Sequence, residues 1–519
     1  MSYNEIFLII LIVLSWTIII ISLAPEINKT KHFSTLGPAL MIKSTKNVGI
    51  LDSIAKRLPA KFIGKISTIL VIFGGLLAFG MLLYEAILLT IIHIPTSAAP
   101  PLNEYLALPL INPFIPLGYG TASLVFAVVI HEMFHGIVAR KQGIKVNSVG
   151  GLFFIIPIGA FVEPDEKEIM AADPVVRRRI VAAGPGINLI IAAICIALLV
   201  FVMMPVSAPL HNGIYVENST TLYSGHAIPK GVEITSYGNL TGKQLNNLGT
   251  TSMITPGMAN VTLFNGKTES IQSVPTGVAI MDLISGCPAE NAHVPANSII
   301  YNISDAAGSH VIYNINTLGN VLDNIKPGTQ INMTVITFKG GETFKTYSMH
   351  TVSTYGYYAK HDPTANRASY KNESFIGVQI GYSGIGYASI DSMHSLVFGG
   401  QITGPGFYET LGLPLLGLSP IPGSLAHMFS TPFNSYIFFG IANTLYWIFW
   451  IDFLLGIMNA LPLSILDGGQ FFKDTLNIAS RKERLKFLRD ENNVKKIYYA
   501  IGIFVFMLLM YIIIAPRVI

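Results

Sequence analysis

The chain has 519 residues and a formal net charge of +4, with 12% charged and 51% hydrophobic residues. Soluble domains are about 25% charged, so much of this chain is expected to face lipid. The small net charge offers no basic stripe for nucleic acid, and two cysteines exclude a disulfide framework and a cysteine-based metal site.

Residues 1–117 are predicted to form two membrane helices joined by a basic loop. Residues 6–24 are nearly all apolar; Glu5 precedes them and lysines follow, which favours a retained helix over a cleaved signal peptide. Eight lysines and arginines between residues 29 and 65 predict a cytoplasmic loop, so the N-terminus is expected outside. Residues 66–92 form the second predicted span, and a proline-rich external loop follows.

The third predicted span, residues 118–138, contains His131-Glu132-Met133-Phe134-His135. Two histidines four apart on a helix project from one face and can bind one metal ion, and the glutamate between them can accept a proton from water, as in zinc-dependent hydrolysis. Ionisable residues at membrane depth are costly and indicate a functional site. The alternative is a pair of buried histidines hydrogen-bonded between helices. Arg140 and Lys141 place the motif near the cytoplasmic side.

Two further segments complete this half of the predicted core, which ends at residue 204. Residues 149–162 are apolar but too short and too rich in glycine and proline to span, which predicts a re-entrant strand pair. The following helix, residues 180–204, begins with small residues and Asn188. Small residues allow close helix packing and Asn188 can hydrogen-bond across helices, so packing alone and a functional role both remain open.

From residue 205 to about 435 the composition changes to Asn, Ser, Thr and Gly, which predicts a β-rich region outside the membrane. An internal repeat opens at Gly213-Ile214-Tyr215-Val216, then Ser224-Gly225, and again at Gly277-Val278-Ala279-Ile280, then Ser285-Gly286. Each copy later has Pro-Gly before a strand. This order resembles PDZ domains of the bacterial protease type, which bind peptide ends by adding a strand at a sheet edge.

The fifth predicted span, residues 434–462, carries Asp452 and ends in Asn459-Ala460-Leu461-Pro462, with Leu466-Asp467-Gly468-Gly469 directly after it. A basic loop and a last span, residues 497–514, follow, so six spans place every strongly basic loop inside. Asp452 lies seven residues before Asn459, on roughly the same helix face. It either orients the site or is a carboxylic acid hydrogen-bonded to a neighbouring helix.

The histidine motif, combined with the Asn459 and Asp467 motifs in a later helix, resembles the site-2 protease family of intramembrane zinc proteases, which cut membrane-anchored regulators. The resemblance covers the third to fifth spans and includes a PDZ insert. It implies that His131, His135 and Asp467 bind zinc and that Glu132 is the catalytic glutamate.

The resemblance also assigns roles around the metal. Asn459 matches an asparagine thought to contact the substrate carbonyl, Gly159-Ala160-Phe161 resembles a strand that pairs with an unwound substrate, and Ala183-Gly184-Pro185 with Asn188 matches a signature of less certain role. A catalytic zinc takes three protein ligands and leaves one open position. The Asn459 amide can donate to an oxyanion, and a strand edge can satisfy the amides of an unwound helix. The alternative for Asp467-Gly468-Gly469 is a helix-ending turn.

The sequence therefore predicts a polytopic α-helical membrane protein with about six transmembrane helices, a re-entrant β segment and an inserted tandem PDZ-like extracytoplasmic region. The predicted function is regulated intramembrane proteolysis by a Zn²⁺ metalloendopeptidase of the cell membrane, with membrane-anchored substrates and the active site toward the cytoplasm. Two other classes are a transporter, which would show related hydrophobic halves that we do not find, and an idle PDZ-bearing scaffold, which need not keep His131, Glu132, His135 and Asp467. The predicted domains are 1–117, 118–204, 205–276, 277–383, 384–433 (an interfacial segment) and 434–519.

Overall fold

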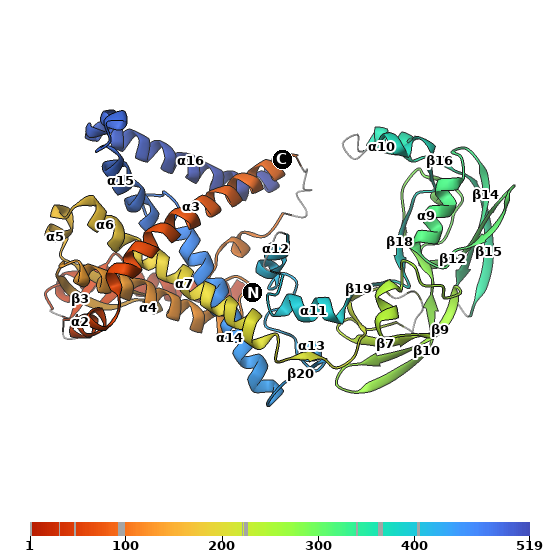
Figure 1. The fold of residues 1–519 in the computed structure, drawn as a ribbon, viewed down its shortest axis with the longest axis horizontal. Helices are drawn as coiled ribbons and strands as arrows, with labels where there is room; N and C mark the ends of the chain where they lie inside the picture. Colours follow the sequence, from red (N-terminus) through yellow and green to blue (C-terminus); the bar gives the residue numbers. More distant parts are fainter. Residues whose placement is uncertain are drawn as a thin grey trace. The chain divides into compact units, whose positions relative to one another are not determined.

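The computed structural model describes residues 3–518 except 31, 46–47, 92–98, 110, 221, 223–226, 339–340, 362–366 and 402–404. Lys31 and Lys46 of the predicted basic loop, and Ser224-Gly225 of the first repeat, lie outside the described residues. The chain divides into two compact units, which we call the helical unit (Met1–Phe201 and Gly440–Ile519) and the β unit (Val202–Phe439). Figure 1 shows helices in the first and a large sheet in the second.

Among the described residues, five helices are long and apolar enough to cross a membrane, which indicates a multi-pass membrane protein. They are α3 (Ala60–Ile91), α4 (Leu117–Lys141), α7 (Ala183–Leu198) with its π-helical continuation η3 (Leu199–Met203), α14 (Ser435–Asn459) and α16 (Glu491–Val518). A shorter apolar helix, Leu11–Ile27, belongs to α1 (Tyr3–Ile27). The sixth span and the orientation remain predictions. Large apolar side chains such as Phe73 and Met507 are exposed, as expected of side chains that face lipid.

Small residues bring α7 close to its neighbours in the helical unit. A methyl group at Gly186 would overlap the backbone and side chain of Ser67 on α3, and one at Gly456 on α14 would lie 2.8 Å from the Leu189 side chain. Without a hydrophobic driving force between helices in lipid, such close backbone approach supplies the packing energy. The start of α7 is therefore held between α3 and α14, beside α4.

A four-stranded antiparallel sheet lies in the helical unit, in the order β1 (Phe33–Leu36), β2 (Ala39–Ser44), β3 (Val146–Phe154) and β4 (Ile156–Pro164). The predicted strand pair at residues 149–162 is confirmed as β3 and β4, while β1, β2 and the helix α2 (Val48–Arg57) occupy part of what we expected to be a basic loop. β4 is an edge strand of this sheet and packs against α4.

Short helices complete the helical unit. Asp165 caps α5 (Glu166–Ala171), and Asp173 caps α6 (Pro174–Val181) by accepting a hydrogen bond from Val175 N–H, with proline at the first helical position. After α14 the chain turns and forms α15 (Asp467–Ala479), which packs against α6. The remaining elements of this unit are η2 (Leu102–Tyr105) and η6 (Glu483–Arg489).

The β unit contains one continuous sheet with an internal symmetry of strand order. Neighbouring strands follow the order β10-β9-β7-β6-β19-β18-β11-β12-β14-β15. Read from the middle outward, the two halves β19-β6-β7-β9-β10 and β18-β11-β12-β14-β15 have the same arrangement of corresponding strands. The first copy has β6 (Ile214–Ser219), β7 (Glu233–Tyr237), η4 (Gly242–Asn247), β9 (Gly257–Phe264) and β10 (Thr268–Thr276). The second has β11 (Val278–Leu283), β12 (Ser298–Asp305), α9 (Ile315–Asn324), β14 (Gln330–Thr337) and β15 (Thr343–His350). Each copy has its own buried apolar core.

The two central strands come from the segment that follows both copies. β18 (Val378–Tyr382) pairs with β11, and β19 (Ile385–Ser389) pairs with β6. Only Ser383 and Gly384 separate them, and the Ser383 hydroxyl accepts a hydrogen bond from Tyr237 at 2.8 Å. β19 lies within residues 384–433, which we expected to form an interfacial segment, and extends the sheet of the first copy.

Smaller elements complete the β unit. They are β5 (Ala208–Pro209), β8 (Leu240–Thr241), α8 (Pro288–Asn291), β13 (Gly308–Val311), β16 (Val352–Ser353), α10 (Thr354–His361), η5 (Ala368–Asn372), β17 (Ser374–Phe375), α11 (Ile390–Val397), α12 (Pro405–Gly412), α13 (Gly423–Ala426) and β20 (Phe429–Ser430). β5 pairs with β20, so the two ends of this unit lie side by side.

Candidate metal centre

Three residues far apart in the sequence converge in the helical unit. His131 and His135 lie one turn apart on α4, and their Nε2 atoms are 2.9 and 3.2 Å from Oδ2 of Asp467 on α15. One nitrogen or oxygen atom from each of the three residues lies within 4.8 Å of the others. His131 is buried and the other two are half-buried. Two imidazoles and one carboxylate are a ligand set that zinc takes at catalytic sites.

Asp467 is the first residue of α15, which is separate from the span that precedes it. α14 ends at Asn459, and the chain turns before α15 begins, so the alternative of a helix-ending turn is wrong: this motif starts a helix. A methyl group at Gly468 would overlap the backbone of Ala460 and Leu461. Glycine is therefore needed next to Asp467 for α15 to fold back closely on the turn after α14.

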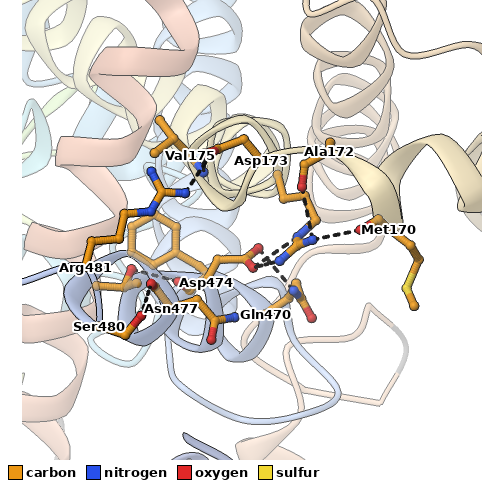
Figure 2. A network of polar contacts seen from close by, with 12 residues as sticks. Met170, Ala172, Asp173, Val175, Gln470, Asp474, Asn477, Ser480 and Arg481 are labelled. Atoms are coloured by element: carbon orange, nitrogen blue, oxygen red, sulfur yellow. Dashed lines mark hydrogen bonds and ion pairs between the residues drawn. The ribbon is translucent and has the colours of Figure 1, made fainter. Parts of the chain in front are cut away.

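A network of polar contacts fixes α15 on α6 (Figure 2). The fully buried Asp474 accepts hydrogen bonds from the Arg177 guanidinium at 2.7 and 3.1 Å and from Gln470 at 3.1 Å. Arg177 also donates to the carbonyl oxygens of Met170 and Ala172. Asp474 lies two turns after Asp467, on roughly the same face of α15. The network therefore sets the position of the Asp467 carboxylate, the candidate metal ligand, from a distance of two helical turns.

A second, exposed ion pair joins the same two helices. Arg481 donates to the Asp173 carboxylate at 2.7 Å, and both side chains are about half exposed. The Val175 N–H and, to a smaller degree, Arg481 hold the pKa of Asp173 below its usual value. Exposed pairs of this kind contribute little to stability, so the buried Arg177–Asp474 pair is the principal polar link.

Both histidines have a partner at their other ring nitrogen. His135 Nδ1 is 2.8 Å from the carbonyl oxygen of Ile180, an acceptor only, so Nδ1 carries a proton and Nε2 is the nitrogen that faces Asp467. His131 Nδ1 is 3.3 Å from the Asn188 amide on α7. Such partners fix the tautomer and the ring plane of a metal-binding histidine.

Gly184 on α7 lines the site, and the space around it shows whether a metal ion fits there. A methyl group there would lie 2.5 Å from His131 Nε2 and closer still to His135 Nε2. Glycine thus keeps the space beside both ligand atoms free. The donor types, their convergence and this cradle all fit a single divalent cation such as Zn²⁺.

Glu132 lies between the two histidines and contacts the edge strand. Its Oε2 accepts a hydrogen bond from Val162 N–H at 3.4 Å, so the carboxylate faces β4. Gly159, Ala160 and Phe161 precede Val162 on this strand, and Gly159 faces Val128 of α4. The structure thereby brings the predicted base and the predicted substrate-pairing segment to one edge of the sheet.

Two polar residues of α14, Asn459 and Asp452, are not among the three residues that converge at the candidate metal centre. Asn459, half-buried, is the last residue of α14 and makes no side-chain hydrogen bond within the described part of the chain. Asp452 is fully buried, and neither carboxylate oxygen has a hydrogen-bond partner among the described residues. Among the described residues, the expectation that Asp452 hydrogen-bonds to a neighbouring helix is therefore wrong.

Sequence reasoning missed Arg177, Gln470 and Asp474, which hold α15 in place. One signal was available: Asp467, Gln470 and Asp474 follow a spacing of three and four residues, which places polar groups on one helix face. Their partner could not be identified because Arg177 is 297 residues away.

Comparisons with known proteins agree with this geometry. A family model described as peptidase family M50 matches residues 119–509, well over half of the chain, including the two histidines and Asp467. A protein of Methanocaldococcus jannaschii described as uncharacterized is 32% identical over 202 residues, which cover 39% of this chain and 52% of the relative. The chain therefore matches about half the length of this curated relative.

Proposed function

The chain belongs to peptidase family M50, and we propose that it is a zinc-dependent endopeptidase that hydrolyses peptide bonds in or near transmembrane segments of membrane-anchored proteins. The family match confirms the resemblance to site-2 proteases drawn from the sequence motifs. We extend this assignment to the metal, the substrate class and the role of each residue, including a part in regulated intramembrane proteolysis.

The convergence of His131, His135 and Asp467 carries the proposal. Three ligand atoms from two helices meet beside a glycine that no other residue could replace without overlapping the imidazoles. Zinc bound by two histidines and a carboxylate acts as a Lewis acid toward water and the scissile carbonyl.

Glu132 acts as the general base in this proposal. Its carboxylate takes a proton from the attacking water and passes it to the leaving amide nitrogen, so that the amine departs neutral. Asn459 is proposed to donate its amide N–H to the oxygen of the tetrahedral intermediate. Its lack of a side-chain partner among the described residues leaves the amide available for this role.

The edge of β4 is proposed to hold the unwound substrate. Val162 N–H points away from β3 toward Glu132, and alternate residues of a strand point the same way. The register from Gly151↔Ala160 to Val149↔Val162 is uninterrupted, so Ala160 presents its N–H and C=O at the open edge. A substrate strand paired with Ala160 would have its next peptide bonds beside Glu132, with its freed amides satisfied.

Metal content and cleavage measured together test the residue roles. In Glu132→Gln we expect cleavage of single-span reporter proteins to disappear while zinc content stays near that of the parent chain. In Asp467→Ala both should be lost. Full zinc loss in Glu132→Gln with activity retained in Asp467→Ala would contradict the assignment. An idle scaffold would bind zinc and cleave no reporter, and a transporter would do neither.

For the β unit we propose two PDZ-like domains, with the second nested inside the first. The matching strand orders support this, as do the positions of β18, which contacts β11 and α9, and β19, which contacts β6 and η4. The first domain would then combine residues 205–276 with β19. We propose that this region excludes substrates that still carry a large outer domain.

The paired ends of the β unit permit a clean excision. Because β5 and β20 are neighbours, residues 210–428 can be replaced by a short Gly-Ser linker. We expect the shortened chain to bind zinc like the parent and to cleave reporters with folded outer domains that the parent refuses. Equal cleavage of all reporters by both chains would show that the β unit does not select by size.

Orientation in the cell membrane is part of the same proposal, with the β unit outside and the metal centre toward the cytoplasm. A cysteine introduced beside Lys243 should react with an impermeant thiol reagent added to intact cells, whereas one beside Lys486 should not. The reverse labelling pattern would invert the orientation.

A further inference from the structure

Asn188 lies at a position that the proposed reaction does not yet explain. It is on α7, one turn after Gly184, and its side chain is completely buried. Its Nδ2 atom is 3.3 Å from His131 Nδ1, on the side of the ring opposite Asp467. Its Oδ1 atom is also buried and has no hydrogen-bond partner in the part of the chain that the structure describes.

A buried amide oxygen without a partner destabilises the fold, so its placement beside a proposed metal-ligand histidine calls for a physical reason. The Nδ2-to-Nδ1 arrangement suits a ring whose proton is on Nε2. A neutral imidazole that offers its Nε2 lone pair to a cation carries its proton on Nδ1 and must donate it. Rotating the Asn188 amide by half a turn exchanges Nδ2 and Oδ1 and supplies that acceptor.

We propose that Asn188 is a positioning residue for the metal centre: Oδ1 accepts the His131 Nδ1–H, which fixes the tautomer and ring plane that present Nε2 to the cation. The inference rests on the proposed metal site. It gives His131 the same kind of support that His135 receives from the Ile180 carbonyl. It also gives α7 two roles on one face, since Gly184 leaves space beside Nε2 and Asn188 holds Nδ1.

The test compares two substitutions of similar size in the full-length protein. Asn188→Asp keeps an oxygen acceptor, whereas Asn188→Leu keeps the volume and removes it. Thr68→Val is the matched control, because Thr68 is a buried polar residue of α3 whose hydroxyl bonds only within its own helix, to Gly64 O. Zinc affinity is measured by competition with chelators of graded strength, and the absorption spectrum of the Co²⁺-substituted protein reports the ligand geometry.

We expect Asn188→Leu to weaken zinc binding about 10–100-fold, the usual effect of losing such a partner, and to alter the Co²⁺ spectrum. Asn188→Asp and Thr68→Val should keep parental affinity and spectrum. Parental affinity in Asn188→Leu would overturn the inference while the proposed function stands. Equal weakening of zinc binding in Asn188→Asp and Asn188→Leu would also overturn it, since the effect would then come from packing and not from the acceptor oxygen. Failure of the proposed function would appear instead in the parent chain, as zinc binding no tighter than that of Asp467→Ala.

Discussion

The helical unit and the β unit each bury a carboxylate completely, but they pair it with different side chains. In the helical unit, Asp474 is bound by the guanidinium of Arg177, which keeps its charge at every physiological pH. In the β unit, Glu233 contacts His211 at 3.3 Å and accepts the backbone N–H of Gly213 at 3.0 Å. Histidine changes its charge within the physiological range.

The difference follows from what each carboxylate supports. Asp474 holds the helix that begins with Asp467, so a permanent ion pair keeps this proposed metal ligand in one position regardless of pH. Glu233 is on β7 and accepts the N–H of Gly213, the residue directly before the neighbouring strand β6. In the helical unit the buried carboxylate thus supports the helix that carries Asp467, whereas in the β unit it connects two strands of the sheet.

The largest effect should come from filling the space beside the metal ligands. In Gly184→Ala, the new methyl group would lie 2.5 Å or less from both Nε2 atoms, and the rings cannot move away because their Nδ1 atoms are held. We expect zinc content and cleavage to be lost. Gly80→Ala on α3 is the matched control, since a methyl group there meets nothing within 4 Å. Zinc retained by Gly184→Ala would place the metal elsewhere.

An intermediate effect is expected from breaking the buried pair. Asp474→Ala leaves Arg177, which is only 18% exposed, without its carboxylate. Removing one partner of a buried pair costs about 3–5 kcal/mol, and here it also releases α15. We expect lower thermal stability and faster zinc loss to a chelator, both measured on purified protein.

The exposed pair between the same helices provides the control for this change. Arg481→Ala removes the contact between Arg481 and Asp173, whose side chains are 52% and 50% exposed. The change should lower thermal stability only slightly, with zinc retained. If Arg481→Ala destabilised the protein as much as Asp474→Ala, burial would not distinguish the two pairs and the proposed role of Asp474 would be wrong.

Local signals in the sequence predicted the parts of the molecule that depend on local pattern. Hydropathy located the five long helices. The motif spacing selected His131 and His135, and the family resemblance added Asp467, which the structure brings together with them. The β3–β4 pair was also predictable, because β-branched and aromatic residues alternate with turn residues over a few positions.

Pairing between distant segments was not predictable in this way. β1 and β2 lie in a lysine-containing stretch whose apolar pattern is too short to identify. β2 pairs with β3, more than 100 residues later, and β1 pairs with β2. β19 pairs with β6, which precedes it by an entire repeat. Asp452 is a further case. Its position on a helix face could be predicted from the sequence, but its lack of a hydrogen-bond partner among the described residues could not.

The smallest effect concerns Glu233 and depends on pH. Burial raises the pKa of this carboxyl above its usual value, and His211 and the Gly213 N–H offset the rise only in part. In the window between the usual and the raised pKa, the folded chain therefore binds more protons than the unfolded chain. Folding stability is then greatest below this window and falls as the pH rises through it.

Glu233→Gln should remove this dependence while keeping the fold, because the amide oxygen can still accept the Gly213 N–H and the shape is unchanged. Hydrogen exchange of β-unit segments in the full chain, measured from below to above the usual glutamate pKa, should show protection falling with pH in the parent. The fall should be smaller in Glu233→Gln, whereas segments of α15 should behave alike in both proteins, since Asp474 is paired with an arginine. An identical pH dependence of β-unit exchange in the two proteins would show that Glu233 does not titrate in this window. The contrast between the two buried carboxylates would then concern geometry alone.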